Sequence, residues 1–159
     1  MLSFKKIVYT FLLFISACGF TPVYTENTSS QLRGQISLQD PNTQNDFIFY
    51  SQLIERFGAM GDKYTLSYSI STSKKDKALN FDGTVHRLEI SGSVLFNLKD
   101  RETGNEILSD MEEIHLSYSN AGSTASVLNA ERTTSKELIV LLANKVADRI
   151  SLAIVEKNL

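Results

Sequence analysis

The sequence predicts an α+β fold: a two-layer sandwich with a mainly antiparallel sheet of 3-4 strands covered on one face by two helices, in the order (β)-α-β-β-β-α. Three segments between residues 64 and 119 alternate apolar with polar side chains, which is the period of a half-buried strand. Short turn signals join these segments, so neighbouring strands run antiparallel. Two further segments, 44–57 and 126–156, repeat apolar residues every three or four positions, as helices with one buried face do.

A short strand and a helix open the predicted domain. Residues 35–38 predict the strand, and Asp40-Pro41-Asn42 is a turn. Either Asn42 or Thr43 can cap the helix predicted over 44–57. The apolar face of this helix consists of Phe47, Tyr50, Leu53, Ile54 and Phe57, and Gly58 and Gly61 end it.

Three longer strands follow the helix. Residues 64–71 alternate large apolar side chains with serine and threonine, so one face is apolar and the other carries hydroxyls. We expect the charged run 74–77 to form a hairpin tip, and residues 88–98 to form the second strand. Thr103-Gly104-Asn105 is a tight turn into the third strand, 107–119. Two adjacent carboxylates, Glu112 and Glu113, interrupt the third alternation and predict a bulge or a frayed edge there.

A long helix over 126–156 closes the chain. Its apolar residues recur every fourth position and form a wide stripe that must pack against the sheet. The stripe consists of Leu138, Leu142, Val146, Ile150 and Ile154, flanked by Ile139, Ala143 and Ala147.

The N-terminal segment has the pattern of a bacterial lipoprotein signal. Two lysines precede a nine-residue apolar run over 7–15, and Ile15-Ser16-Ala17 stands directly before Cys18. The run is too short for a transmembrane helix, which needs about 20 apolar residues. We therefore expect removal of residues 1–17, acylation of Cys18 with chains such as palmitate, a flexible tether over 18–34 and a single domain over 35–159. A plain secretory signal is the other interpretation.

Composition argues against several classes of function. The chain has 16 Lys and Arg against 18 Asp and Glu. Loss of Lys5 and Lys6 with the signal leaves 14 against 18, a net charge of −4, which disfavours nucleic-acid binding. One cysteine and two histidines, His86 and His115, predict neither a disulfide nor a zinc site. No catalytic motif is present, so we expect a protein that is not an enzyme and has no cofactor.

Several short motifs occur in a characteristic order along the chain. They are Cys18-Gly19-Phe20-Thr21-Pro22-Val23-Tyr24, Tyr64-Thr65-Leu66, Arg87, Ser117-Tyr118-Ser119-Asn120, Ala130-Glu131-Arg132, Leu138, Leu142-Ala143 and Ile150. In their joint order and spacing they resemble LptE, the lipopolysaccharide-assembly lipoprotein family of Gram-negative bacteria, in its alphaproteobacterial form. The weak first strand and the lysine-rich run 74–77 depart from the family pattern.

The resemblance implies a plug inside the lumen of the LptD β-barrel, where the two proteins insert lipopolysaccharide into the outer leaflet without covalent chemistry. Gly19, directly after the acylated cysteine, resembles the class sorted to the outer membrane. A barrel lumen is polar, and the hydroxyl face of 65–73 suits it. The same face also suits any soluble sandwich with one wet side.

Lipopolysaccharide carries phosphates, which lysine and arginine bind. The candidate contacts are Lys74, Lys75, Lys77 and Arg87, and a solvated turn is the alternative interpretation. Two other functions stay open: a periplasmic auxiliary lipoprotein of an ABC-type exporter, and a generic envelope scaffold lipoprotein. A permease and an ATPase encoded beside the gene favour the exporter.

Overall fold

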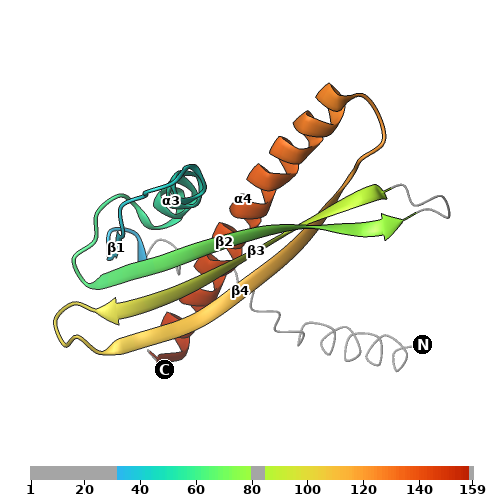
Figure 1. Cartoon of the computed structure of the whole chain (residues 1–159). Coiled ribbons are helices and arrows are strands. Elements are labelled where there is room, and N and C mark those ends of the chain that lie inside the picture. Colours follow the sequence, from blue (N-terminus) through green and yellow to red (C-terminus); the bar gives the residue numbers. More distant parts are fainter. Residues whose placement is uncertain (1–31, 80–84, 158–159) are drawn as a thin grey trace, which may run out of the picture.

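Three long antiparallel strands and one short parallel strand form a single sheet in the order β1-β2-β3-β4 (Figure 1). The computed structural model describes residues 32–79 and 85–157. The elements are β1 (Ile36–Leu38), α3 (Gln44–Phe57), β2 (Tyr64–Leu79), β3 (Val85–Asp100), β4 (Glu106–Ser119) and α4 (Thr124–Lys157). The predicted α+β fold and its element order are confirmed. The predicted signal 1–17 and the acylated Cys18 lie outside the described residues.

Helix α3 begins and ends where its sequence predicts. Thr43 caps it: the Thr43 hydroxyl accepts a bond from the Asp46 amide at 3.1 Å, and the Asp46 carboxylate accepts one from the Thr43 amide at 2.9 Å. At the other end Gly58 adopts a φ of +87°, which side chains disfavour. Its amide bonds to the carbonyl of Ile54 and satisfies the last turn.

The short strand β1 pairs with β2 in parallel, because α3 carries the chain across between them. Ile36 lies opposite Tyr64 and is completely buried. The backbone at Gly61 lies so close to β1 that an added Cβ would be 2.2 Å from the Ile36 nitrogen, so only glycine fits at this position. Of the segment expected as a tether, the structure describes residues 32–34, and Leu32 is buried in the core.

The hairpin of β2 and β3 is longer than the sequence predicts. Strand β2 runs through Leu79, so the prediction of a hairpin tip at 74–77 is wrong. Lys74 lies opposite Ile90 and Lys75 opposite Glu89, and a cross-strand pair of opposite charge favours continued pairing. The β-bulges of this hairpin fall just beyond Asp76.

The expected bulge or frayed edge at Glu112 and Glu113 is also wrong. Glu112 pairs with Val94 and Glu113 with Ser93 without a shift in register. Glu112 occupies the helix-facing phase of β4, where Lys145 of α4 lies 2.6 Å from its carboxylate. The lysine compensates the charge, so the strand stays regular.

Helix α4 supplies much of the core between the two layers. Its predicted apolar stripe is confirmed, since every residue of it is buried. Gly92 of β3 allows the close approach: a Cβ there would lie 2.9 Å from Leu138 Cδ2 and 3.0 Å from Leu142 Cδ1. Arg56 of α3 forms an ion pair with Asp148 of α4 at 2.9 Å and joins the two helices.

Candidate functional site

The sheet face opposite the helices is uncovered and largely polar. In β2 the residues of one phase, Tyr64, Leu66 and Tyr68, are buried with the helices. The other phase, from Thr65 to Ser73, consists of exposed hydroxyl residues. Long strands with one wet face are stable in an antiparallel sheet. We call the uncovered side of β2, β3 and β4 the open face.

Two large apolar side chains interrupt the open face at its centre. Leu95 of β3 lies directly opposite Met111 of β4, and both occupy the polar phase of their strands. Their exposed fractions are 59% and 54%. Directly opposed side chains in a sheet contact each other, so the two residues form one apolar patch among serines.

A shallow depression of about 290 Å³ lies beside this patch. Within it, the side-chain oxygen Oδ1 of Asn97 is buried and has no hydrogen-bond donor among the described residues. The amide nitrogen of the same side chain donates to the Glu106 carboxylate, which fixes the orientation of the amide. A buried acceptor without a donor costs about 1–3 kcal/mol, so this oxygen is a locally unfavourable feature of the sheet. The depression is lined by Ser67, Tyr68, Ser69, Leu95, Phe96, Asn97, Ser109 and Asp110.

A histidine with two carboxylate neighbours lies on the same face. His115 Nδ1 is 3.6 Å from Glu89 and Nε2 is 3.4 Å from Glu113, and the imidazole is half exposed. Among the described residues no group of three or more His, Cys, Asp or Glu side chains has the arrangement of a metal site. The imidazole lies between carboxylates of two neighbouring strands on the open face.

The structure separates the four predicted basic contacts. Lys75 and Arg87 lie on the open face, both exposed. Lys74 lies on the opposite side, where α4 is, because adjacent residues of a strand point to opposite faces. Lys77 belongs to β2, but the structure does not describe the position of its side chain. The four residues therefore do not form one cluster.

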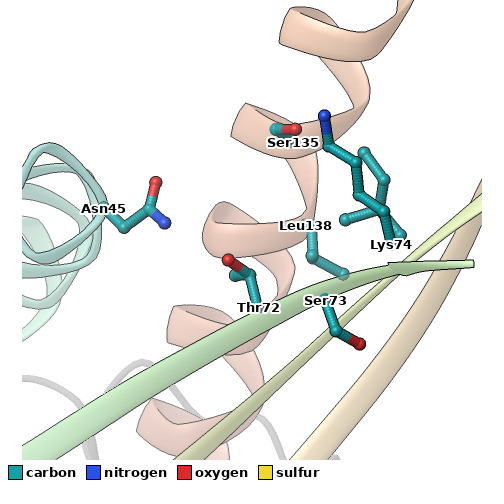
Figure 2. Close-up of a pocket in the computed structure, with 7 residues that line it drawn as sticks. Asn45, Thr72, Ser73, Lys74, Ser135 and Leu138 are labelled. Atoms are coloured by element: carbon teal, nitrogen blue, oxygen red, sulfur yellow. The ribbon is translucent and has the colours of Figure 1, made fainter.

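Lys74 is part of a separate polar cluster between β2 and α4. It forms an ion pair with Glu131, whose second oxygen accepts a bond from the Tyr118 hydroxyl at 3.2 Å. The bond from Lys74 holds the pKa of the Glu131 carboxyl below its usual value. A pocket of about 210 Å³ adjoins this cluster, and Figure 2 shows Lys74 and Thr72 on the α4 side of β2 with Ser73 on the other.

The sequence alone did not indicate Leu95, Met111 or Asn97 as candidate residues of the open face. The sequence does contain an indication for Leu95 and Met111, because each is apolar at a position where the alternation of its strand predicts a polar residue. The unpaired oxygen of Asn97 depends on the position of Glu106 across the hairpin, which the sequence pattern does not specify. Neither helix of the described residues is long and apolar enough to span a bilayer.

The fold is similar to those of several solved lipoproteins. A candidate lipoprotein from Caulobacter crescentus CB15 has a TM-score of 0.64 at 18% identity, over 82% of this chain and 97% of that chain. Rare lipoprotein B from Shewanella oneidensis has a TM-score of 0.60 at 18% identity, over 79% and 98%. A minor lipoprotein from Acinetobacter baumannii has a TM-score of 0.53 at 19% identity, over 75% and 91%. At these identities the likeness establishes the fold.

Comparisons of the sequence with known families and curated proteins find no match.

Proposed function

We propose that this protein is an outer-membrane lipoprotein of the LptE kind, anchored through Cys18, which plugs the LptD β-barrel and assists lipopolysaccharide assembly into the outer leaflet without catalysing a reaction. The open face is the observation that carries the proposal. It is a long, hydroxyl-rich surface with a central apolar pair, and no described element covers it. The lipoprotein signal and the shared fold with three lipoproteins support the anchor.

The dimensions and chemistry of the open face suit the inner wall of a barrel. A strand of 16 residues at about 3.3 Å each spans roughly 50 Å, which exceeds the roughly 25 Å apolar band of an outer-membrane barrel. The lumen of such a barrel is lined with polar groups that can bond to serine and threonine hydroxyls. Leu95 and Met111 would supply the apolar centre that protein interfaces require.

The first test is affinity purification of the tagged protein from detergent-solubilised envelopes, with mass spectrometry of what accompanies it. We expect a large β-barrel protein in equal amount. Recovery of a permease and an ATPase would support the exporter function instead, and recovery of no partner would support neither. The Cys18→Ala variant should leave the membrane fraction, because it lacks the thiol that carries the acyl chains.

A second test asks whether the open face makes the contact. Leu95→Asp with Met111→Asp should abolish recovery of the barrel, because two carboxylates would be desolvated at the interface. The matched control places the same charges at Leu141 and Leu152, which are exposed on α4. Equal loss in both variants would contradict the assignment of the open face.

Lys75 and Arg87 are the proposed contacts to lipopolysaccharide phosphate, because they share the open face and Lys74 is engaged by Glu131. Reversing both charges to glutamate should weaken lipopolysaccharide binding at low salt. The control reverses Arg132 and Lys136 on α4. An affinity equal to that of the unmodified protein would exclude Lys75 and Arg87 as contacts.

A further inference from the structure

Strand β4 forms one edge of the sheet, and the pairing pattern shows which of its backbone groups face outward. The Tyr64 amide bonds to the Gln35 carbonyl, and the Leu66 carbonyl accepts a bond from Gln39, so even-numbered residues of β2 direct their polar backbone groups toward β1. Alternation through the antiparallel pairs then directs the odd-numbered residues of β4 from Ser109 onward away from β3. Their amides and carbonyls form the outer edge of the sheet. Ile107 precedes them and lies at the register shift beside Leu98.

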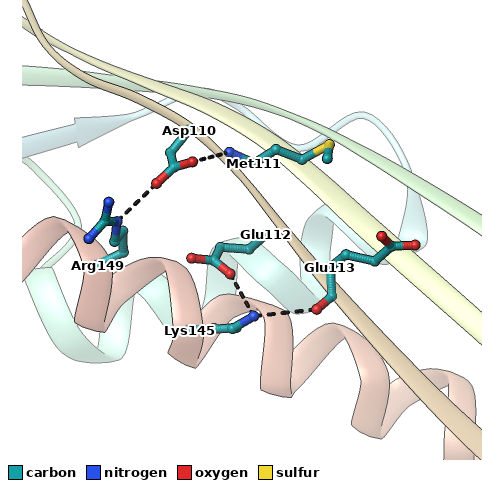
Figure 3. Close-up of polar contacts among 6 residues, drawn as sticks. All are labelled: Asp110, Met111, Glu112, Glu113, Lys145 and Arg149. Carbon is teal, nitrogen blue, oxygen red and sulfur yellow. Dashed lines mark hydrogen bonds and ion pairs between the residues drawn. The ribbon is translucent and has the colours of Figure 1, made fainter.

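Two of these outward groups are bonded to side chains, and so is the carbonyl of Ile107 at the register shift. Lys157 Nζ donates to the carbonyl of Ile107 at 2.8 Å. The Asp110 carboxylate accepts a bond from the amide of Met111 at 2.9 Å. Lys145 Nζ lies 3.4 Å from the carbonyl of Glu113 and donates to it (Figure 3).

Helix α4 holds these side chains in place. Arg149 pairs with Asp110 at 2.9 Å, and this bond holds the pKa of the Asp110 carboxyl below its usual value, so the acceptor of the Met111 amide stays ionised. Lys145 is held at the same time by Glu112 at 2.6 Å (Figure 3). Asp110 and Glu112 both occupy the helix-facing phase of β4, and inward-pointing charges on an edge strand discourage pairing with another chain.

We propose that Asp110, Lys145 and Lys157, here called the edge latch, close the edge of β4 to strand addition by a second copy of this chain. The chain itself offers a complementary edge. Strand β1 pairs only with residues 64–66 of β2, and beyond them no described strand pairs with that edge of β2. An unlatched β4 edge would add to this stretch of another molecule, and such head-to-tail contacts build rings or open filaments. The latch therefore keeps the domain monomeric, whichever envelope partner the open face binds.

The unmodified protein allows a first test by amide exchange, measured residue by residue by NMR on the full chain. Met111, Ser109 and Glu113 all direct their amides outward, and of the three only the Met111 amide is bonded to the latch. After correction for intrinsic rates, Met111 should exchange roughly fivefold more slowly than Ser109 and Glu113. Equal exchange of the three amides would overturn the proposal.

The second test removes the latch. The triple variant Asp110→Ala, Lys145→Ala and Lys157→Ala should at least double the molar mass measured by light scattering after size exclusion, and the unmodified protein should stay monomeric. A monomeric triple variant with a native circular dichroism spectrum would overturn the proposal. If the triple variant does not fold, the amide-exchange experiment on the unmodified protein tests the proposal instead.

The matched control removes Arg132, Lys136 and Glu137, which are exposed on α4 and make no hydrogen bond or ion pair with the described part of β4. Both triple variants lose two positive charges and one negative charge, so the net charge changes by −1 in each. The control should remain monomeric. Association of the control to the same extent would attribute the effect to net charge and would overturn the role of the latch.

Discussion

The close packing of α4 on β3 makes Leu142→Ala a strongly destabilising substitution. Leu142 is completely buried. Its truncation removes three carbon atoms, which costs about 2.4 kcal/mol in lost transfer free energy at about 0.8 kcal/mol each. The facing position is Gly92, which has no side chain that can move into the space. A residual cavity of roughly 70 Å³ adds about 1.7 kcal/mol, so we expect a total loss of about 4 kcal/mol.

Equilibrium unfolding in urea measures this loss. With a slope of about 2 kcal/mol per molar, the midpoint should fall by about 2 M while the slope stays unchanged. The control is Leu141→Ala, one residue earlier on the same helix, where the side chain is 38% exposed. That substitution should cost less than about 1 kcal/mol. If both variants had the same midpoint, the assigned rotation of α4 against the sheet would be wrong.

Three further predictions follow from local geometry. Thr43→Ala should lower the free energy of unfolding by about 1 kcal/mol, measured in urea, because it removes the acceptor at the start of α3; an unchanged midpoint would contradict the capping role. Gly92→Val should cost about 1–3 kcal/mol and lower the thermal midpoint, because its Cβ would contact buried side chains of α4; a stability equal to that of the glycine form would show a looser interface. The Glu131 carboxyl has a lowered pKa in the folded protein, so its contribution is complete above its usual value of 4.5 and disappears as the pH falls through the lower folded value. Glu131→Gln should therefore flatten the decline of the thermal midpoint as the pH falls below 4.5, and a parallel decline in both proteins would refute the role of its bond to Lys74.

Periodicity was sufficient to predict the fold, because the spacing of apolar residues follows burial on one face. The predicted apolar face of α3 is wrong at Phe47, which is exposed, whereas Phe49 is completely buried. The bounds of α3 and the buried stripe of α4 follow from that spacing and from the cap at Thr43. The parallel pairing of β1 does not, since three residues carry no information about direction. The local sequence did not predict that β2 continues past Lys74, because the residues that pair with this part of β2 lie in another strand, at Ile90 and Glu89.

The candidate site was less predictable, because it depends on which strand neighbours meet. Four basic residues close in sequence suggest a cluster, but alternation sends Lys74 to the helix side and Lys75 to the open face. The pairing of Leu95 with Met111 requires the register of the β3–β4 hairpin. A one-residue change in that register would move Met111 to the opposite face of the sheet.

The departures from alternation in β3 and β4 are therefore informative in two opposite ways. Charges in the apolar phase, at Asp110 and Glu112, form ion pairs with Arg149 and Lys145 of α4, and these pairs hold the proposed edge latch in place. Apolar residues in the polar phase, at Leu95 and Met111, pair with each other but are covered by no described element and stay exposed. Local violations of a folding pattern that the fold does not compensate are expected at functional surfaces. The compensated pair explains why the domain would remain a monomer, and the uncompensated pair indicates where a partner would bind it.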